Sequence, residues 1–149
     1  MSKLRIAVID GKGGGLGRAV VEAVLTLPGE RFALYALGTN AQATRVMMAA
    51  GAPDGATGEH AVCYMAGRMD IIIGPMALLI GNAMMGEITP AMAAAISASP
   101  AQKLLLPLAR CGVRVVGMDD VPLRELIGRL PQELAAMMDR MEAGEAESL

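Results

Sequence analysis

The 149-residue sequence predicts an α/β fold, a three-layer sandwich with a mostly parallel central sheet of five to six strands. Two observations support this prediction. Short apolar segments rich in β-branched residues alternate with longer segments whose apolar residues recur at helical spacing. The short segments also lack the apolar–polar alternation of half-exposed strands, as expected for parallel strands buried on both faces. No repeat or linker interrupts residues 1–149, so we expect a single domain.

The N-terminal half follows a strand–helix order. We expect a strand at 4–9, a helix at 16–27, a strand at 32–37, a helix at 41–50, a loop at 52–60 and strands at 61–65 and 70–73. Pro28-Gly29 and Gly51 are typical helix ends, and Gly38 and Gly74-Pro75 end apolar runs in the manner of strands.

The C-terminal half continues this order with one ambiguity. We expect helices at 76–85 and 91–99, strands at 103–106 and 113–116, a helix at 122–141 and a polar tail at 142–149. Thr89 and Pro90 are typical of an N-cap and the first helical position. Only residues 107–112 separate the last two strands, too few for a parallel crossover, so the last strand is either antiparallel or displaced by an irregular link. Together, the elements predict a Rossmann-like domain.

Composition excludes several classes of protein. The net charge is −2 and the chain has one Phe, two Tyr and no Trp, so we expect no nucleic-acid partner. The most apolar segment, residues 71–85, is too short to cross a membrane and contains Gly74, Pro75 and Asn82. Two cysteines, Cys63 and Cys111, without a secretory signal fit the cytoplasm, where a disulfide between them is not expected.

The clearest functional signal is the loop after the first strand, where five of the seven residues from Gly11 to Gly17 are glycine. Leu16 stands where the strict G-x-G-x-x-G pattern needs glycine, but Gly11, Gly15 and Gly17 fit the spacing G-x-x-x-G-x-G. Glycines before a helix let an anion approach exposed N–H groups and the positive end of the helix dipole. We therefore predict a phosphate-binding loop made by Asp10, Gly11, Lys12, Gly13, Gly14, Gly15, Leu16 and Gly17.

The stretch "GKGGGLGRAVVEAV" resembles the opening of the short-chain dehydrogenase family, which implies a dinucleotide loop. That family's Tyr-x-x-x-Lys is missing, because Arg68 follows Tyr64 and Thr39 follows Tyr35 at that spacing. A Walker loop is disfavoured because Arg18-Ala19 replaces Lys-Ser/Thr. An Asp-x-Gly phosphate hairpin is disfavoured because a helix follows, and a strand-to-helix turn without a ligand is the remaining alternative.

Further candidates lie at other strand ends. Thr39 and Asn40 follow the second strand where an acid would bind an NAD ribose, so they favour NADP, a mononucleotide or a sugar phosphate; capping of the next helix is the alternative. Gly74 and Pro75 should face the glycine loop across the switch point of the sheet. Glu87 is either a functional carboxylate or an exposed turn residue. The two cysteines and the single His60 offer no metal-ligand spacing.

Taken whole, the chain resembles an uncharacterised family of small proteins from anaerobic Firmicutes, a domain of unknown function. The resemblance rests on "RIAVIDGKGGGLG", "ALGTNAQAT", "GATGE", "GEITPAMA" and "LLPLARCGV", and it implies a stand-alone Rossmann-like domain without supplying a reaction. The first functional hypothesis is a sensing or regulatory module that binds NADP or another phosphate-containing nucleotide. The alternatives are a small enzyme whose site is completed in a homo-oligomer, with Thr57, Glu59, His60 and Glu87 near the loop, and a structural protein. Thirteen methionines and the apolar stripe of the last helix favour a homo-oligomer.

Overall fold

A computed structural model describes residues 2–107, 112–118 and 120–145. Its core is a five-stranded parallel sheet with the strand order β3-β2-β1-β4-β5. The strands are β1 (Leu4–Asp10), β2 (Phe32–Gly38), β3 (Asp54–Thr57), β4 (Ile71–Pro75) and β5 (Gln102–Leu106). The chain moves outward from β1 to β3 and then returns to the other side of β1 for β4 and β5, which confirms the Rossmann-like prediction.

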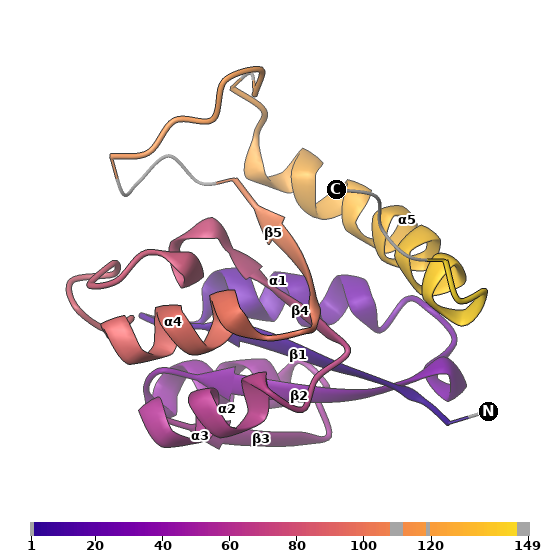
Figure 1. Ribbon diagram of the computed structural model, residues 1–149, viewed down its shortest axis with the longest axis horizontal. Coiled ribbons are helices and arrows are strands. Elements are labelled where there is room, and N and C mark those ends of the chain that lie inside the picture. The colour runs from indigo at the N-terminus through magenta and orange to yellow at the C-terminus, as the bar shows by residue number, and fades with distance from the viewer. Residues whose placement is uncertain (1, 108–111, 119, 146–149) are drawn as a thin grey trace.

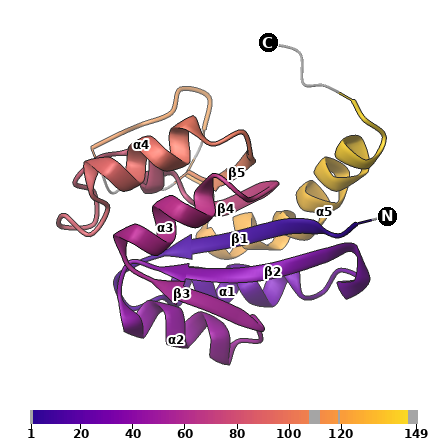
Figure 2. The same cartoon turned by 60° about the horizontal axis from the view of Figure 1, so that its bottom comes forward.

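Helices cover both faces of the sheet, and Figure 2 shows α1 and α2 on one side of the strands and α3 and α4 on the other. The α-helices are α1 (Gly15–Val24), α2 (Ala41–Ala49), α3 (Glu59–Ala66), α4 (Pro90–Ala98) and α5 (Leu123–Glu142), and the 3₁₀ helices are η1 (Gly29–Arg31) and η2 (Met76–Leu79). Ile6 and Val8 of β1 pack with α1, α2 and α5, whereas Ala7 and Ile9 pack with α3 and α4. This alternation buries β1 on both faces from Ile6 to Asp10.

The long helix α5 packs beside α1 on the same face of the sheet (Figure 1). Its C-terminal half is anchored by the buried residues Leu134, Met137 and Met138, and Arg31 donates hydrogen bonds to Asp139 and Glu142 at its end. Pro131 lies inside the helix and has no N–H, so the carbonyl of Ile127 lacks its usual helical partner. The N-terminal half, before Leu130, contains no buried residue.

The structure differs from the sequence predictions in four segments. Residues 54–57 form β3 instead of a loop, and the strand expected at 61–65 lies within α3, which covers residues 59–66. The helix expected at 76–85 is limited to the short η2, after which Asn82, Met84 and Met85 have positive φ angles. Residues 113–116 form no strand, so the sheet has five strands among the described residues.

The remaining elements match within a few residues, including the capping pair before α4, where the hydroxyl of Thr89 accepts a hydrogen bond from the N–H of Met92. Cys63 is a free thiol, whereas Cys111 and the end of the predicted tail, residues 146–149, lie outside the described residues.

Candidate functional site

The glycine loop lines a cavity at the carboxyl end of the sheet, between β1 and β4. The cavity has a volume of about 430 Å³ and is lined by Asp10, Gly11, Lys12, Gly13, Gly14, Gly15, Leu16, Pro75, Ala77, Met84 and Met85. β1 and β4 are the neighbouring strands at which the chain reverses its direction across the sheet. Ligands of doubly wound folds bind at this switch point, outside the carboxyl ends of the strands.

Three of the five loop glycines are required by packing. A Cβ on Gly17 would lie 2.9 Å from the Cβ of Asp10 and 2.5 Å from the sulfur of Met47, which is fully buried. A Cβ on Gly14 would lie 2.8 Å from the Cα of Ala43, and Gly14 also has a φ of +77°. A Cβ on Gly11 would lie 2.6 Å from the hydroxyl of Thr39. These glycines permit close approach of the chain whether or not a ligand binds.

The other two loop glycines, Gly13 and Gly15, have no such structural reason. A Cβ at either position would meet nothing within 4 Å, and neither residue has a φ in the left-handed region. Both residues line the cavity. In the described part of the chain, the backbone N–H groups of Gly13, Gly15 and Leu16 also lack an internal hydrogen-bond acceptor. The loop therefore presents free N–H donors to the cavity. Because positions 13 and 15 are glycine, no Cβ there obstructs access to these donors.

Asp10 supports the loop from below. Its carboxylate accepts a hydrogen bond from the N–H of Gly17 at 2.7 Å, inside the first turn of α1, and only 3% of the residue is exposed. Burial raises the pKa of Asp10, while hydrogen bonds from the backbone of Gly17 and Gly11 act in the opposite direction. This geometry is that of a residue that orients the loop through its backbone amides. The described residues contain no group of three or more His, Cys, Asp or Glu side chains that could hold a metal ion.

Glu87 joins the glycine loop to the end of β2. Its Oε1 atom accepts hydrogen bonds from the N–H of Lys12 at 2.8 Å, from the Thr39 hydroxyl at 2.6 Å and from the Asn40 side-chain amide at 2.9 Å. Burial alone would raise the pKa of Glu87, but these three hydrogen bonds and the charge of Lys12 together lower it. Glu87 is thus a fixed, ionised carboxylate, and the sequence pattern alone could not distinguish it from an exposed turn residue.

The other predicted site residues lie around this core. Asn40 caps α2 by accepting a hydrogen bond from the N–H of Ala43, as the alternative interpretation expected, and its amide also donates to the carbonyl of Lys12. Pro75 lines the cavity, whereas Gly74, Gly17, Thr39 and Asn40 do not. Arg18 points to Glu22, with which it forms an ion pair on the surface of α1. Ala77, Met84 and Met85 are cavity residues that the sequence did not suggest, because we expected them inside a regular helix.

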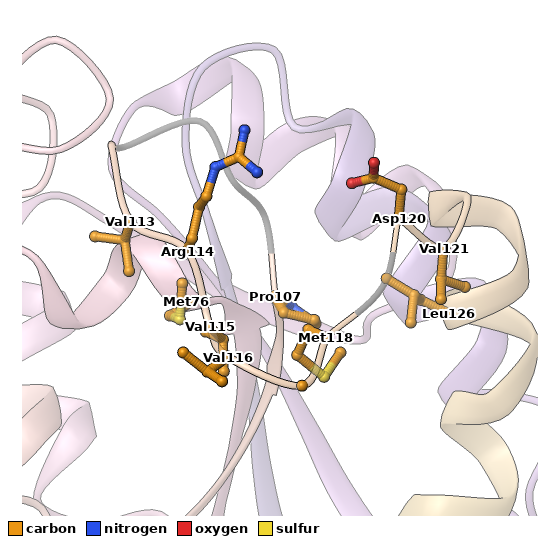
Figure 3. A pocket seen from close by; sticks show the side chains of 11 residues that line it. Met76, Pro107, Val113, Arg114, Val115, Val116, Met118, Asp120, Val121 and Leu126 are labelled. Atoms are coloured by element: carbon orange, nitrogen blue, oxygen red, sulfur yellow. The ribbon is translucent and has the colours of Figure 1, made fainter.

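A second cavity lies at the same edge of the sheet, between β4 and β5, with a volume of about 480 Å³. Its lining is mainly apolar: Met76, Pro107, Val113, Val115, Val116, Met118, Val121 and Leu126. Figure 3 shows Met76, Val115 and Val116 close together, with the charged ends of Arg114 and Asp120 extending away from them. The described part of residues 112–122 that forms most of this wall contains neither helix nor strand.

Comparison with known proteins establishes the family but not the activity. The profile of a domain of unknown function, DUF3842, matches residues 5–139, so the chain belongs to this family. No curated protein matches the chain. Among solved structures, a universal stress protein in complex with cAMP matches with 22% sequence identity and a TM-score of 0.39, covering 71% of this chain and 98% of the other. No helix in the described part of the chain is long and apolar enough to cross a membrane.

Proposed function

We propose that this member of the DUF3842 family binds a small phosphate-containing nucleotide at the glycine loop and acts as a sensing or regulatory module. The observation that carries the proposal is the pair Gly13 and Gly15. Both line the cavity at the switch point of the sheet, and nothing in the packing or backbone conformation requires glycine at either position. Access of a ligand to the backbone is the reason that remains for glycine there.

The surrounding polar groups support an anionic ligand. The free N–H groups of Gly13, Gly15 and Leu16 lie at the N-terminus of α1, where the helix dipole favours a negative charge. The exposed Lys12 stands in the same loop and supplies a positive charge. The carboxylates of Asp10 and Glu87 would repel a highly charged anion in the cavity, but hydrogen bonds from backbone N–H groups offset part of the negative charge of each carboxylate. This balance favours one bound phosphate group over several.

The enzyme alternative receives less support from the described residues. Thr57 forms a hydrogen bond with Thr44, and Glu59 and His60 are exposed at the start of α3. Glu87 is the one residue of the predicted set Thr57, Glu59, His60 and Glu87 that reaches the glycine loop. Binding without turnover is therefore the function that we propose.

The homo-oligomer stays part of the proposal. Val115, Val116, Met118 and Leu123 are exposed apolar residues near the second cavity and the start of α5, and burying them in a subunit interface would remove their apolar surface from water. Sedimentation tests this proposal, and a monomer at all protein concentrations would contradict it.

The nucleotide proposal is tested by thermal unfolding with AMP, cyclic AMP, ATP, GTP, FMN, NAD and NADP. A ligand at 100 times its dissociation constant stabilises a protein by about 2.7 kcal/mol, which corresponds to a rise in Tm of roughly 5–10 °C at this chain length. The Gly15→Val variant fills the open side of the loop and should abolish the rise while leaving the Tm of the free protein within a few degrees.

The matched control is Gly67→Ala, because Gly67 also has open space around it but lies at the end of α3, outside the cavity lining. This variant should respond to ligand like the wild type. If no compound of the panel raises the Tm of the wild type, or if Gly15→Val retains the full response, the proposed function is wrong.

A further inference from the structure

The position of Glu87 bears on which nucleotide the loop accepts. Residues 38–40, at the end of β2, contain no acid, although dinucleotide-binding folds place an acid there to bind the ribose hydroxyls. In this structure Glu87, which follows η2 in the chain, brings a carboxylate to the same corner, where it accepts hydrogen bonds from Thr39 and Asn40. The Glu87 carboxylate, from the segment between η2 and α4, thus occupies the corner at which residues 38–40 supply no acid.

The carboxylate of Glu87 lies next to the cavity wall. Its Oε1 atom accepts a hydrogen bond from the N–H of Lys12 and would lie 2.9 Å from a Cβ on Gly11, and both of these residues line the cavity. All three hydrogen bonds to this carboxylate go to Oε1, and none is found for Oε2 in the described part of the chain. The second oxygen is therefore left to accept a hydrogen bond from a ligand.

The same contacts change the roles expected of Thr39 and Asn40. Their donor groups, which could otherwise bind a 2′-phosphate, are already directed at Glu87. A second phosphate at this corner would meet a carboxylate in place of free donors. Two negative charges a few ångströms apart at the partly buried edge of a protein repel strongly.

Resting on the proposed phosphate site, we infer that Glu87 determines ligand specificity by accepting a hydrogen bond from a ribose hydroxyl and by excluding a second phosphate from that position. The ligand class is accordingly a nucleotide with a free ribose 2′-hydroxyl. NADP, which carries a 2′-phosphate, should bind more weakly than NAD, which does not. This inference therefore differs from the sequence-based interpretation of Thr39 and Asn40, which favoured NADP.

Three probes that share adenine and a 5′-phosphate and differ only at the 2′ position of the sugar test the inference: AMP, 2′-deoxyadenosine 5′-monophosphate and adenosine 2′,5′-bisphosphate. Calorimetric titration of the wild type should show AMP binding most tightly, the deoxy compound several-fold more weakly, and the bisphosphate at least about tenfold more weakly. In Glu87→Gln, which keeps the side-chain shape but removes the charge, the disadvantage of the bisphosphate relative to AMP should fall at least about fivefold.

The ratio of two ligands within one variant separates specificity from damage to the fold, because a distorted loop weakens both ligands together. Thr39→Val removes one donor to Glu87 but keeps the carboxylate, so it should change the ratio less than Glu87→Gln does. Glu59→Gln removes an exposed acid of α3 and is the matched charge control.

The inference is overturned if the wild type binds the bisphosphate as tightly as AMP, or if Glu87→Gln leaves the ratio unchanged. Failure of all three probes to bind the wild type overturns the inference, and the proposed nucleotide site fails with it only if no compound of the thermal-unfolding panel binds either. Binding of AMP that is lost in Gly15→Val, with equal binding of the bisphosphate, overturns the inference alone.

Discussion

The two cavities at the carboxyl edge of the sheet have similar volumes but differently built walls. Around the glycine loop, the backbone is fixed by close packing at Gly14 and Gly17 and by the hydrogen bonds of Asp10 and Glu87. Around the second cavity, most of the wall is an irregular segment whose apolar side chains are partly or fully exposed, and Val116 is fully exposed. Size therefore does not separate the proposed binding site from the second cavity. The fixed donors of its wall favour the glycine-loop cavity, since a preorganised wall needs little ordering when a ligand binds.

The largest effect on stability is expected at Gly14, where close backbone packing fixes the wall of the glycine-loop cavity. Gly14→Ala would place a Cβ 2.8 Å from the Cα of Ala43 in a residue whose φ is +77°. Overpacking and left-handed strain should together lower the free energy of unfolding by about 2–4 kcal/mol, as measured by urea denaturation. Gly13→Ala is the neighbouring control and should change stability by less than about 1 kcal/mol. Equal losses in the two variants would contradict the division of the loop glycines into structural and ligand-facing ones.

A smaller effect is expected from the charge of Glu87. Because hydrogen bonding lowers its pKa in the folded protein below the ordinary value of 4.5, the ionised form stabilises the fold above that value, and this contribution is lost as the pH falls through the folded-state pKa. At pH 7, the wild type should exceed Glu87→Gln in unfolding free energy by about 1 kcal/mol. The difference should shrink below pH 4.5.

Denaturation of both proteins at stepwise lower pH measures this difference. Asp10, whose pKa is raised by burial and which Glu87 also affects through its charge, titrates in both proteins, so most of its contribution cancels. Lys12 is the neighbouring cation, and its charge favours the ionised form of Glu87. A difference that grows on acidification would contradict the role of the Glu87 carboxylate.

The smallest effect is expected in the second cavity. Val116→Asp changes a fully exposed side chain in an irregular segment, so it should alter stability by less than about 0.5 kcal/mol. Nucleotide affinity, measured by the titration used for Glu87, should stay within about twofold of the wild type. A large loss of AMP binding in this variant would show that the ligand extends into the second cavity, and the contrast between the two walls would then fail.

Sequence patterns predicted those elements whose local preferences agree with their place in the fold. The apolar runs of β1, β2 and β4 and the stripe of α5 belong to this group. Residues 54–57, "DGAT", have weak strand preference, yet they pair in parallel with β2 and form the edge of the sheet. Residues 61–65, "AVCYM", contain β-branched and aromatic residues, but they lie in α3, where Val62 is buried against the sheet. In both segments, tertiary pairing decides the structure over local preference.

The candidate site shows the same division. The loop glycines could be found because they adjoin one another in the sequence, but their separate purposes depend on Met47, Ala43 and Thr39, which are distant in the chain. The role of Glu87 depends on the turns at Asn82, Met84 and Met85. The backbone of these residues has positive φ angles, which end the predicted helix and bring the Glu87 carboxylate back to the glycine loop. Such strained positions occur where the surrounding structure imposes them, and the spacing of apolar residues in the sequence does not predict them.

Pro131 divides α5 into two parts that should differ in amide hydrogen exchange. After Pro131, buried Leu134 and Met138 and the bonds from Arg31 hold the helix to the rest of the protein, so exchange there should require opening close to global unfolding. Before Pro131, Leu126 and Ile127 are only half-buried and one helical hydrogen bond is missing. The N-terminal turns can therefore open as a separate cooperative unit, and the wall of the second cavity to which Leu126 belongs would open with them.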